Sequence, residues 1–490
     1  MPNTKKVFII GLDCATPELI FEQWKDDLPN IKRLINSGVY GRLESTIPPI
    51  TIPAWTSMMT SKDPGTLGLY GFRNRSKYTY EDMNFATASQ VKEDAVWDIL
   101  SRAGKKVALV GIPQTYPPKP VNGNMISCFL TPSVKSQYTY PKELKNEIED
   151  LIGEYLIDVK DFRTTDKDYL LRQIYEMTEK RFEVIKYLMK NKEWDFFMFV
   201  EMGTDRIHHG MWKYFDKEHI KHEPGSQHED AIKDYYKFLD KGIGDILSLL
   251  DNDTIVFVVS DHGSKKMDGG ICINEWLIRE GYLTLKEYPN GITPFNKVNI
   301  DWENTIAWGE GGYYARVFMN VKGREPQGVI EPENYETIRN ELVQKLEALG
   351  DEKGKPIGTK AYKPQELYKT CNGLPPDLIV LLGDLYWRSV GTIGHDAIYT
   401  FENDTGPDDA NHAQHGILVM SCLDGSIGNG EKIEDHHLMD IAPTVLNFFG
   451  IEAPNDMQGK VIEQVKTTAD YDQDEEEEIR KRLEALGYVE

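Results

Sequence analysis

The chain has little that would support a disulfide framework or a thiolate metal site. Only five of its 490 residues are cysteine, they are scattered, and no two have the Cys-x-x-Cys spacing of zinc ribbons and redox sites. A disulfide-rich secreted domain is therefore not indicated, and the expected compartment is the reducing cytoplasm.

Long apolar runs and internal repeats are also lacking. No stretch approaches the roughly 18 apolar residues of a membrane span, so no span is expected. Hydrophobic residues nevertheless make up 40% of the chain and aromatic residues 11%, which indicates a globular core rather than a disordered chain. The length of 490 residues predicts two to three compact units, or one large α/β domain with insertions.

Acidic residues outnumber basic ones. Lysine and arginine total 56 against 79 acidic residues, so the net charge is −23. Such a surface repels polymeric nucleic acid and anionic membranes, which makes both poor partners. A small phosphorylated substrate must then be attracted locally, and bound cations can reverse the sign of one cleft. The oligomeric state is left open.

Five short apolar runs end in polar or glycine-containing turns, and helical periodicity follows them. This pattern is typical of an α/β fold in which helices cover both faces of a mostly parallel sheet. The runs are Val7 to Leu12, Val107 to Ile112, Phe196 to Val200, Thr254 to Ser260 and Gly416 to Met420. Ligands of such sheets bind beyond the carboxyl ends of the strands.

Side chains that can bind metals stand beside four of these runs. Asp13 follows the first, Asp205 and His209 follow the third, Asp261 and His262 follow the fourth, and His412 comes just before the fifth. Each residue alone has an ordinary explanation as a turn residue or a helix cap. Together they indicate a metal site of carboxylate and imidazole ligands.

The local spacing of these residues indicates that neighbouring side chains can bind the same ion. Asp205 and His209 are four residues apart, so a helical turn would place both on one face, with His208 as the alternative ligand. Asp261 and His262 precede a glycine that permits a tight turn. His412 has no local partner, and His415 competes with it.

Thr51 is the candidate nucleophile. A proline such as Pro53 fits only in the first turn of a helix, and the residues after it favour a helix. Thr51 is therefore expected at or near a helix amino terminus. Its ordinary role would be that of a cap. Its functional role would be that of a nucleophile. The N–H groups of the helix would hold the phosphate, and a neighbouring metal would activate the hydroxyl.

In this order and spacing, these residues resemble the alkaline phosphatase superfamily, and most closely its type I phosphodiesterase/nucleotide pyrophosphatase branch. The similarity covers nearly the whole chain. It includes GLDCATPE, the Thr-x-Pro turn, SDHG and DIAPTVLNFFGIEAPNDMQGK, the last of which resembles the closing segment of sulfatases. Sulfatase chemistry is disfavoured because it needs cysteine or serine where Thr51 stands.

The resemblance implies an alkaline-phosphatase-like three-layer sandwich and a two-metal phosphodiesterase that forms a phosphothreonine on Thr51. One ion would be held by Asp205, His209 and His412, and the other by Asp13, Asp261, His262 and the Thr51 oxygen. Mixed carboxylate and imidazole ligands favour zinc, although manganese or iron accepts the same set.

One departure concerns substrate binding. Members of the branch are expected to hold a phosphate oxygen with an asparagine about twenty residues after the nucleophile. Asn74 can fill this place, or Arg73 or Arg75 can grip two phosphate oxygens, which would suit a monoester. A phosphomonoesterase, a phosphomutase or another phosphotransferase on the same scaffold is therefore an alternative, and a non-catalytic metal-binding protein is another.

The domain organisation follows from changes in composition. We expect a catalytic core of residues 1–285 and 410–466 with a helical insertion at about 138–192, an inserted cap at 286–409, and an acidic carboxyl-terminal helix at 467–490. Tyr313, Tyr314 and Trp387 of the cap are candidates to stack on a base or a sugar.

Overall fold

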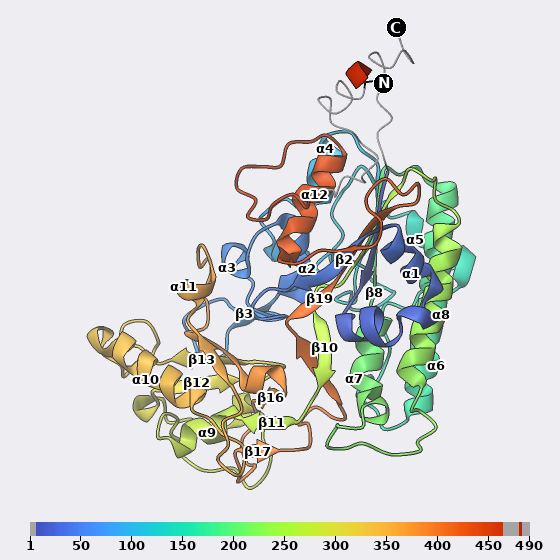
Figure 1. Ribbon diagram of the computed structural model, residues 1–490. Helices are drawn as coiled ribbons and strands as arrows, with labels where there is room; N and C mark the ends of the chain where they lie inside the picture. Colours follow the sequence, from blue (N-terminus) through green and yellow to red (C-terminus); the bar gives the residue numbers. More distant parts are fainter. Residues whose placement is uncertain (1–5, 464–479, 483–490) are drawn as a thin grey trace.

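A ten-stranded sheet forms the centre of the protein (Figure 1). The computed structural model describes residues 6–463 and 480–482, so the expected helix at 467–490 lies outside the described residues except for 480–482. The strand order is β20-β2-β19-β9-β1-β8-β5-β6-β7, with β21 paired to β2. The strands are β1 (Val7–Leu12), β2 (Gly38–Glu44), β5 (Val107–Val110), β6 (Gly123–Ile126), β7 (Thr139–Tyr140), β8 (Phe196–Glu201), β9 (Ile255–Val259), β19 (His415–Cys422), β20 (Glu431–Lys432) and β21 (His436–His437). All five predicted strands are among them.

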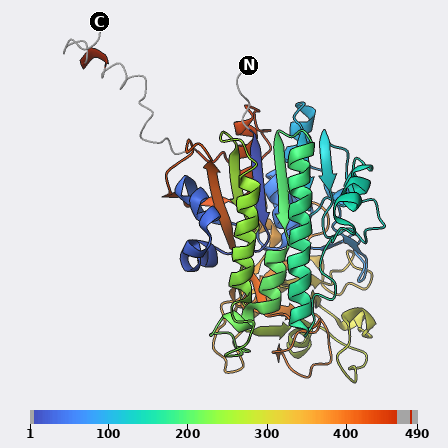
Figure 2. The same ribbon diagram turned by 90° about the vertical axis from the view of Figure 1, so that its right-hand side faces the viewer.

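Helices cover both faces of this sheet. Side chains of a strand alternate between faces, and in β1 Phe8 and Ile10 face one hydrophobic cluster while Val7 and Ile9 face another. The first cluster is closed by α1 (Pro29–Asn36), α5 (Leu144–Ile152), α6 (Lys167–Asn191), α7 (Gly203–Phe215) and α8 (Ala231–Leu247). The second is closed by α2 (Thr51–Thr60), α4 (Val96–Arg102) and α12 (Ile441–Phe448). The predicted three-layer α/β sandwich is therefore confirmed, and Figure 2 shows α6 and α8 lying along one face.

β19 is an antiparallel strand in the sheet, which is mostly parallel as predicted. β1 pairs in parallel with both β8 and β9, but β19 runs antiparallel to β9 and β2. In the β19–β9 pair, Leu418 lies opposite Val259, the last residue of β9. The beginning of β19 therefore lies at the same edge as the carboxyl ends of β1, β8 and β9.

The predicted helical insertion at 138–192 contains α5 and the 25-residue α6. In α6, Leu170, Ile174 and Ile185 are fully buried against the sheet. Apolar residues at helical spacing give this segment one hydrophobic face, so it packs as part of the sandwich.

A smaller unit, residues 269–400, carries two further sheets and the third large hydrophobic cluster. One sheet has the order β12-β13-β15-β14 and the other β16-β11-β17. Their strands are β11 (Gly269–Cys272), β12 (Ala307–Glu310), β13 (Ala315–Met319), β14 (Lys360–Tyr362), β15 (Leu378–Leu381), β16 (Trp387–Val390) and β17 (Tyr399–Thr400), and the helices are α9 (Ile273–Arg279), α10 (Tyr335–Glu347) and α11 (Pro364–Leu367). The amphipathic helix expected near 335–349 is α10. Ile271 and Leu277 already belong to this cluster, ahead of the expected cap boundary at 286, and the division into domains stays a prediction.

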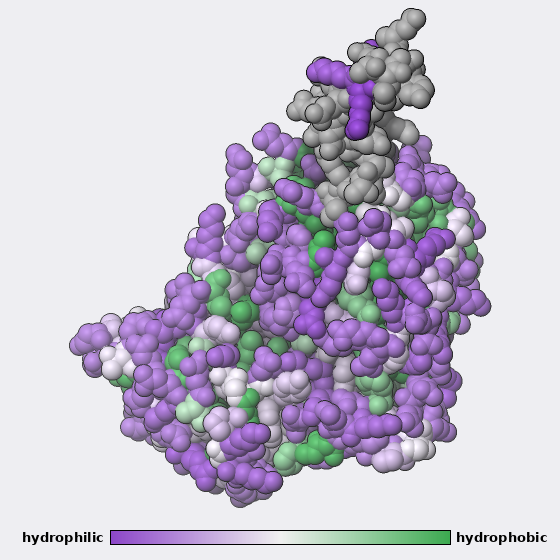
Figure 3. Space-filling model, viewed as in Figure 1, coloured by the Kyte–Doolittle hydropathy of each residue, from purple (hydrophilic) through white to green (hydrophobic). Residues whose placement is uncertain are grey.

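Three short elements connect the two parts around the edge described above. They are the helix α3 (Pro64–Leu67), the hairpin of β3 (Arg73–Arg75) with β4 (Met83–Phe85), and the pair of β10 (Gly263–Lys266) with β18 (Ala410–Ala413). In the described part of the chain, no helix is both long enough and apolar enough to cross a membrane. The face in Figure 3 is mainly hydrophilic, with hydrophobic residues scattered over it.

A buried ion pair joins α6 to the end of β8. Arg181 Nη1 lies 3.2 Å from Glu201 Oε1, and both side chains are almost fully buried. The same oxygen accepts hydrogen bonds from Thr178 and from the backbone N–H of Gly203, where α7 begins. Glu201 therefore fixes the strand end from which α7 carries Asp205.

We expect Arg181→Met to lower the free energy of unfolding by about 3–5 kcal/mol, because it leaves the Glu201 carboxylate buried without its countercharge. Urea unfolding followed by circular dichroism measures this loss. The double variant Arg181→Met/Glu201→Gln should recover part of it. A double variant less stable than Arg181→Met would contradict the role assigned to the pair.

Candidate metal centre

The candidate ligands meet at one edge of the sheet. β9, β1 and β8 are neighbours in the sheet, so the residues after their carboxyl ends come together. Asp13 follows β1, Asp205 and His209 lie in the first two turns of α7, and Asp261 and His262 follow β9. His412 reaches the same edge from β18, just before the antiparallel β19.

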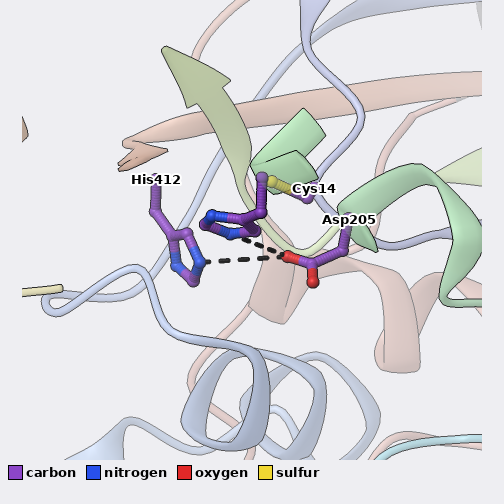
Figure 4. A group of neighbouring side chains, drawn as sticks. Cys14, Asp205 and His412 are labelled. Carbon is purple, nitrogen blue, oxygen red and sulfur yellow. Dashed lines mark ion pairs between the residues drawn. The ribbon is translucent and has the colours of Figure 1, made fainter. Parts of the chain in front are cut away.

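The first ligand group consists of Cys14, Asp205, His209 and His412. Their ligand atoms all lie within 4.8 Å of one another, and every member is buried. Asp205 Oδ1 is 3.3 Å from His209 Nε2 and 3.9 Å from His412 Nε2. Figure 4 shows Asp205 and His412 pointing toward one another. The spacing of four residues on α7 thus places carboxylate and imidazole on one helix face, as the sequence predicted.

The second ligand group consists of Asp13, Asp261 and His262, again within 4.8 Å of one another. His262 Nε2 lies 3.2 Å from Asp261 Oδ2 and 3.8 Å from Asp13 Oδ1. Thr51 is the first residue of α2, and its Oγ1 lies 3.4 Å from the same His262 nitrogen. The hydroxyl of Thr51 therefore adjoins the second group.

Hydrogen bonds orient all three imidazoles in the same way. Each Nδ1 contacts an acceptor outside the two groups: Asp408 Oδ1 at 2.7 Å from His209, Gly263 O at 3.1 Å from His262, and Pro49 O at 2.8 Å from His412. When Nδ1 donates the proton, the lone pair of Nε2 is free and faces the ligand groups.

The polar atoms facing the centre are left unsatisfied. Within residues 6–463 and 480–482, Asp13 Oδ1, Asp261 Oδ2, His209 Nε2 and His412 Nε2 are buried and make no hydrogen bond. Buried polar atoms without partners are rare, and four converging on one place fit cations. Carboxylate oxygens and imidazole nitrogens are suitable donors for zinc and for related divalent metals.

The charges of the second group are poorly balanced. Burial, together with the charge of Asp205, raises the pKa of Asp13, and burial with the charge of Asp13 raises the pKa of Asp261. Burial lowers the pKa of His262 to about 4, so this imidazole offers no positive charge at neutral pH. The metal-free second group therefore holds two carboxylates without a cation.

The first group is better compensated. Burial acts to raise the pKa of Asp205, but His209 and Arg206 hold it well below its usual range. Burial likewise acts to lower the pKa of His209, but Asp408 and Asp205 raise it to about 9. The two groups differ because Arg206 and His209, whose pKa Asp408 helps to raise, keep the pKa of Asp205 low, whereas the pKa values of Asp13 and Asp261 stay raised.

The structure separates the competing histidines. His208 points away from the ligand groups, because its Nε2 contacts the Tyr236 hydroxyl at 3.1 Å and its ring stacks on that tyrosine. His415 is exposed at the start of β19. It is His209 and His412 that the fold brings together with Asp205.

The three predicted substrate-binding residues have different surroundings. Arg75 is buried against Glu325, at 2.9 Å, and donates to Thr79 O. The Asn74 side chain closes a local turn through Tyr70 N and Gly71 O. Only Arg73 faces the cavity that contains Thr51.

That cavity has a volume of about 410 Å³ and holds residues that the sequence did not single out. Its walls include Thr51, His412, Tyr313, Tyr314 and five arginines, Arg73, Arg163, Arg206, Arg316 and Arg388. Tyr313 stacks on His209 and His412, whereas Trp387 packs in the core of the smaller unit. Of the residues that the sequence did not single out, Asp408 has a local signal, because it stands with Asp409 just before His412.

An α/β sandwich with a helix-initial threonine beside two groups of buried metal-type ligands defines a candidate phosphoester hydrolase. The family model for type I phosphodiesterase / nucleotide pyrophosphatase matches residues 7–416. The chain therefore belongs to this family of phosphoric ester hydrolases, as the resemblance had indicated.

Solved structures agree in fold. Human ectonucleotide pyrophosphatase/phosphodiesterase 5 matches with a TM-score of 0.52 and 11% identity over 94% of this chain and 97% of that chain. An inactive threonine-to-alanine variant of the murine protein, in complex with AMP, matches with a TM-score of 0.53 and 10% identity over 94% and 97%. At these identities the likeness shows the alkaline-phosphatase-like fold.

One curated relative matches over a short segment. The 2,3-bisphosphoglycerate-independent phosphoglycerate mutase of Bacteroides thetaiotaomicron is 34% identical over 55 residues, which is 11% of this chain and 11% of the mutase. The chain thus aligns with only a small part of that protein.

We expect Asp261→Asn to stabilise the metal-free protein by about 1–2 kcal/mol at pH 8, because it removes one of two buried carboxylates that repel each other. The pKa of Asp261 is raised above 3.8 in the folded protein, so the folded state binds more protons and wild-type stability falls as the pH rises. The gain should therefore shrink toward pH 4.

Urea unfolding in the presence of a chelator measures this difference. Asp251→Asn serves as the control, because Asp251 is largely exposed in its ion pair with Lys6. A loss of stability in metal-free Asp261→Asn at pH 8 would show that the carboxylates are not in conflict.

Proposed function

We propose that the protein is a two-metal phosphodiesterase in which Thr51 is the nucleophile and carries a phosphothreonine intermediate. One observation carries this proposal. Thr51 Oγ1 lies 3.4 Å from His262 Nε2 of the second ligand group, at the amino terminus of α2 and in the wall of the cavity. A hydroxyl is a weak nucleophile unless a neighbouring base or cation activates it.

Two divalent cations are proposed as cofactors. Asp205, His209 and His412 would hold one, and Asp13, Asp261, His262 and the Thr51 oxygen would hold the other. The donor set favours zinc, while manganese or iron accepts the same ligands. When bound, such cations lower the pKa of a coordinated hydroxyl and neutralise charge on phosphoryl oxygens.

The residues of the chain have separate roles in the proposed reaction. The amino terminus of α2 presents Thr51 and its N–H dipoles to the phosphoryl group. Thr51 Oγ1 forms a bond to phosphorus while the bond to the leaving oxygen breaks, and that oxygen takes up a proton. Water next attacks phosphorus, the bond to Oγ1 breaks, and the threonine is regenerated. Two in-line displacements retain the configuration at phosphorus.

Arg73 is the proposed phosphate-binding residue among the three considered, because it alone lines the cavity with Thr51. A guanidinium binds two phosphate oxygens as a fork. Asn74 and Arg75 are engaged in contacts of the β3–β4 hairpin and of the smaller unit.

A phosphomonoesterase or a phosphotransferase is the second candidate. The short likeness to a phosphoglycerate mutase favours it, as does Arg73 in the cavity wall, because a guanidinium that grips two phosphate oxygens suits a dianion better than a diester. The non-catalytic alternative loses support from membership of a hydrolase family.

The partner is proposed to be a small phosphorylated molecule, in line with AMP in the murine relative. We retain the cytoplasm as the proposed compartment. All five cysteines are free thiols, which suits a reducing environment.

We expect Thr51→Ala to reduce turnover at least about 1000-fold, because it removes the attacking oxygen. Turnover of a nitrophenyl phosphate diester and of the matching monoester, with metal content measured by mass spectrometry on the same sample, tests this and separates the two candidates. Metal content should change little, because six of the seven proposed ligands, all except Thr51, are carboxylates or imidazoles that the variant keeps. Thr51→Ser, which keeps a hydroxyl, is the matched control and should remain active. Full activity in Thr51→Ala would rule out the nucleophile.

We expect His412→Ala to reduce metal content from two ions toward one, because it removes one of three proposed protein ligands of the first ion. His415→Ala is the control, since His415 is exposed on the same segment of chain. Equal metal content in both variants would mean that His412 is not a ligand.

A further inference from the structure

The cavity that contains Thr51 adjoins a second cavity in the smaller unit, with a volume of about 580 Å³. Five residues line both cavities and form what we call the junction: Arg73, Gly311, Gly312, Arg388 and Thr405. A molecule bound at Thr51 and extending into the second cavity must pass these residues. The two charged members of the junction are both arginines.

Arg388 is the more unusual of the two. It lies on β16, only 5% exposed, and in the described part of the chain its Nε and Nη1 make no hydrogen bond. Its nearest carboxylates are Asp408 at 3.6 Å and Asp404 at 3.7 Å. A buried guanidinium normally has its donors satisfied, so this one lacks an acceptor.

Asp408 does not supply that acceptor because other groups use it. Its Oδ1 contacts His209 Nδ1 at 2.7 Å, and its Oδ2 accepts a hydrogen bond from Arg163. Burial acts to raise the pKa of Asp408, but His209 and Arg163 hold it well below its usual range. One carboxylate thus faces two guanidinium groups and an imidazole. Asp404, the other carboxylate near Arg388, lies 3.7 Å from Nη2, which is beyond hydrogen-bond distance.

Arg73 is the other charged residue of the junction. It lies on β3 with an exposed side chain, and among the described residues its guanidinium makes no ion pair. Glu81, Glu310 and Asp404 line the second cavity, but Glu310 is paired with Arg316. Both charged residues that the two cavities share are therefore arginines, in a chain with a net charge of −23.

We propose that the junction binds a second anionic group of the substrate, so that the protein acts on phosphoesters whose alcohol part carries its own carboxylate or phosphate. This inference rests on the proposed function, in which Thr51 receives the phosphoryl group. An oxyanion at the junction would accept the hydrogen bonds that Arg388 lacks, and charge-assisted bonds of this kind are strong. The guanidinium of Arg73 has five N–H donors, so it can contact this oxyanion as well as the phosphoryl group. A neutral alcohol would leave the buried guanidinium unsatisfied.

The test measures binding rather than turnover. Phosphonates that end in a carboxylate, with linkers of about two to six carbon atoms, are compared with the corresponding terminal amides by calorimetry on metal-loaded Thr51→Ala protein. The amide matches the carboxylate in size and lacks only its charge. We expect the acid to bind about tenfold more tightly than the amide at one preferred linker length.

Two variants assign this preference to the junction. Arg388→Gln should abolish it, and Arg73→Gln should reduce it; because Arg73 is exposed, the second variant keeps the test decisive if Arg388→Gln fails to fold. Arg102→Gln is the matched control, since Arg102 is exposed on α4 and paired with Asp94. It should keep the full preference.

The possible failures are distinguishable. Equal binding of acid and amide at every linker length, or a preference unchanged in both junction variants, would overturn the anion site and leave the role of Thr51 intact. Failure of every phosphonate to bind the metal-loaded protein would overturn the proposed function and the anion site together.

Discussion

The central constraint in this protein is the burial of three carboxylates at one edge of a sheet. Asp13, Asp205 and Asp261 lie within the two ligand groups, and all are almost fully buried. Burial of like charges costs free energy unless cations compensate it. His209 and Arg206 hold the pKa of Asp205 well below its usual range, but burial and like charges keep the pKa values of Asp13 and Asp261 raised. The metal-free site is therefore short of positive charge at the place where the substrate must bind. The buried carboxylates lower the stability of the metal-free protein and favour the binding of cations.

The surrounding structure is arranged to keep this deficit in place. Trp55 donates from Nε1 to Asp13 Oδ2 at 2.7 Å, and the backbone N–H of Cys14 contacts Asp261 Oδ1 at 3.3 Å. Each carboxylate thus keeps one oxygen fixed by the protein and one turned toward the ligand group. Asp408 holds the imidazole of His209 in place through Nδ1. Its other oxygen accepts a hydrogen bond from Arg163, which lines the cavity. The ligand groups and the wall of the cavity are therefore mechanically connected.

Much of the sandwich could be predicted because its signals are local. A buried strand with helices on both faces needs an uninterrupted apolar run, and β1, β5, β8, β9 and β19 all have one. The antiparallel direction of β19 has no local signal, since an apolar run looks the same in both directions. The strands of the smaller unit are two to five residues long and separated by glycine and proline, so the periodicity is too short to detect.

The sequence by itself determined which residues stand at the strand ends, because the position after a buried strand is fixed by the chain. It also placed Asp205 and His209 on one helix face, since the period of the helix dictates it. Tertiary structure decided the rest. Asp408 is 199 residues from His209, and Arg388 reaches the cavity from a different sheet. Contacts between such distant segments depend on how the smaller unit packs against the sandwich, which no local pattern records.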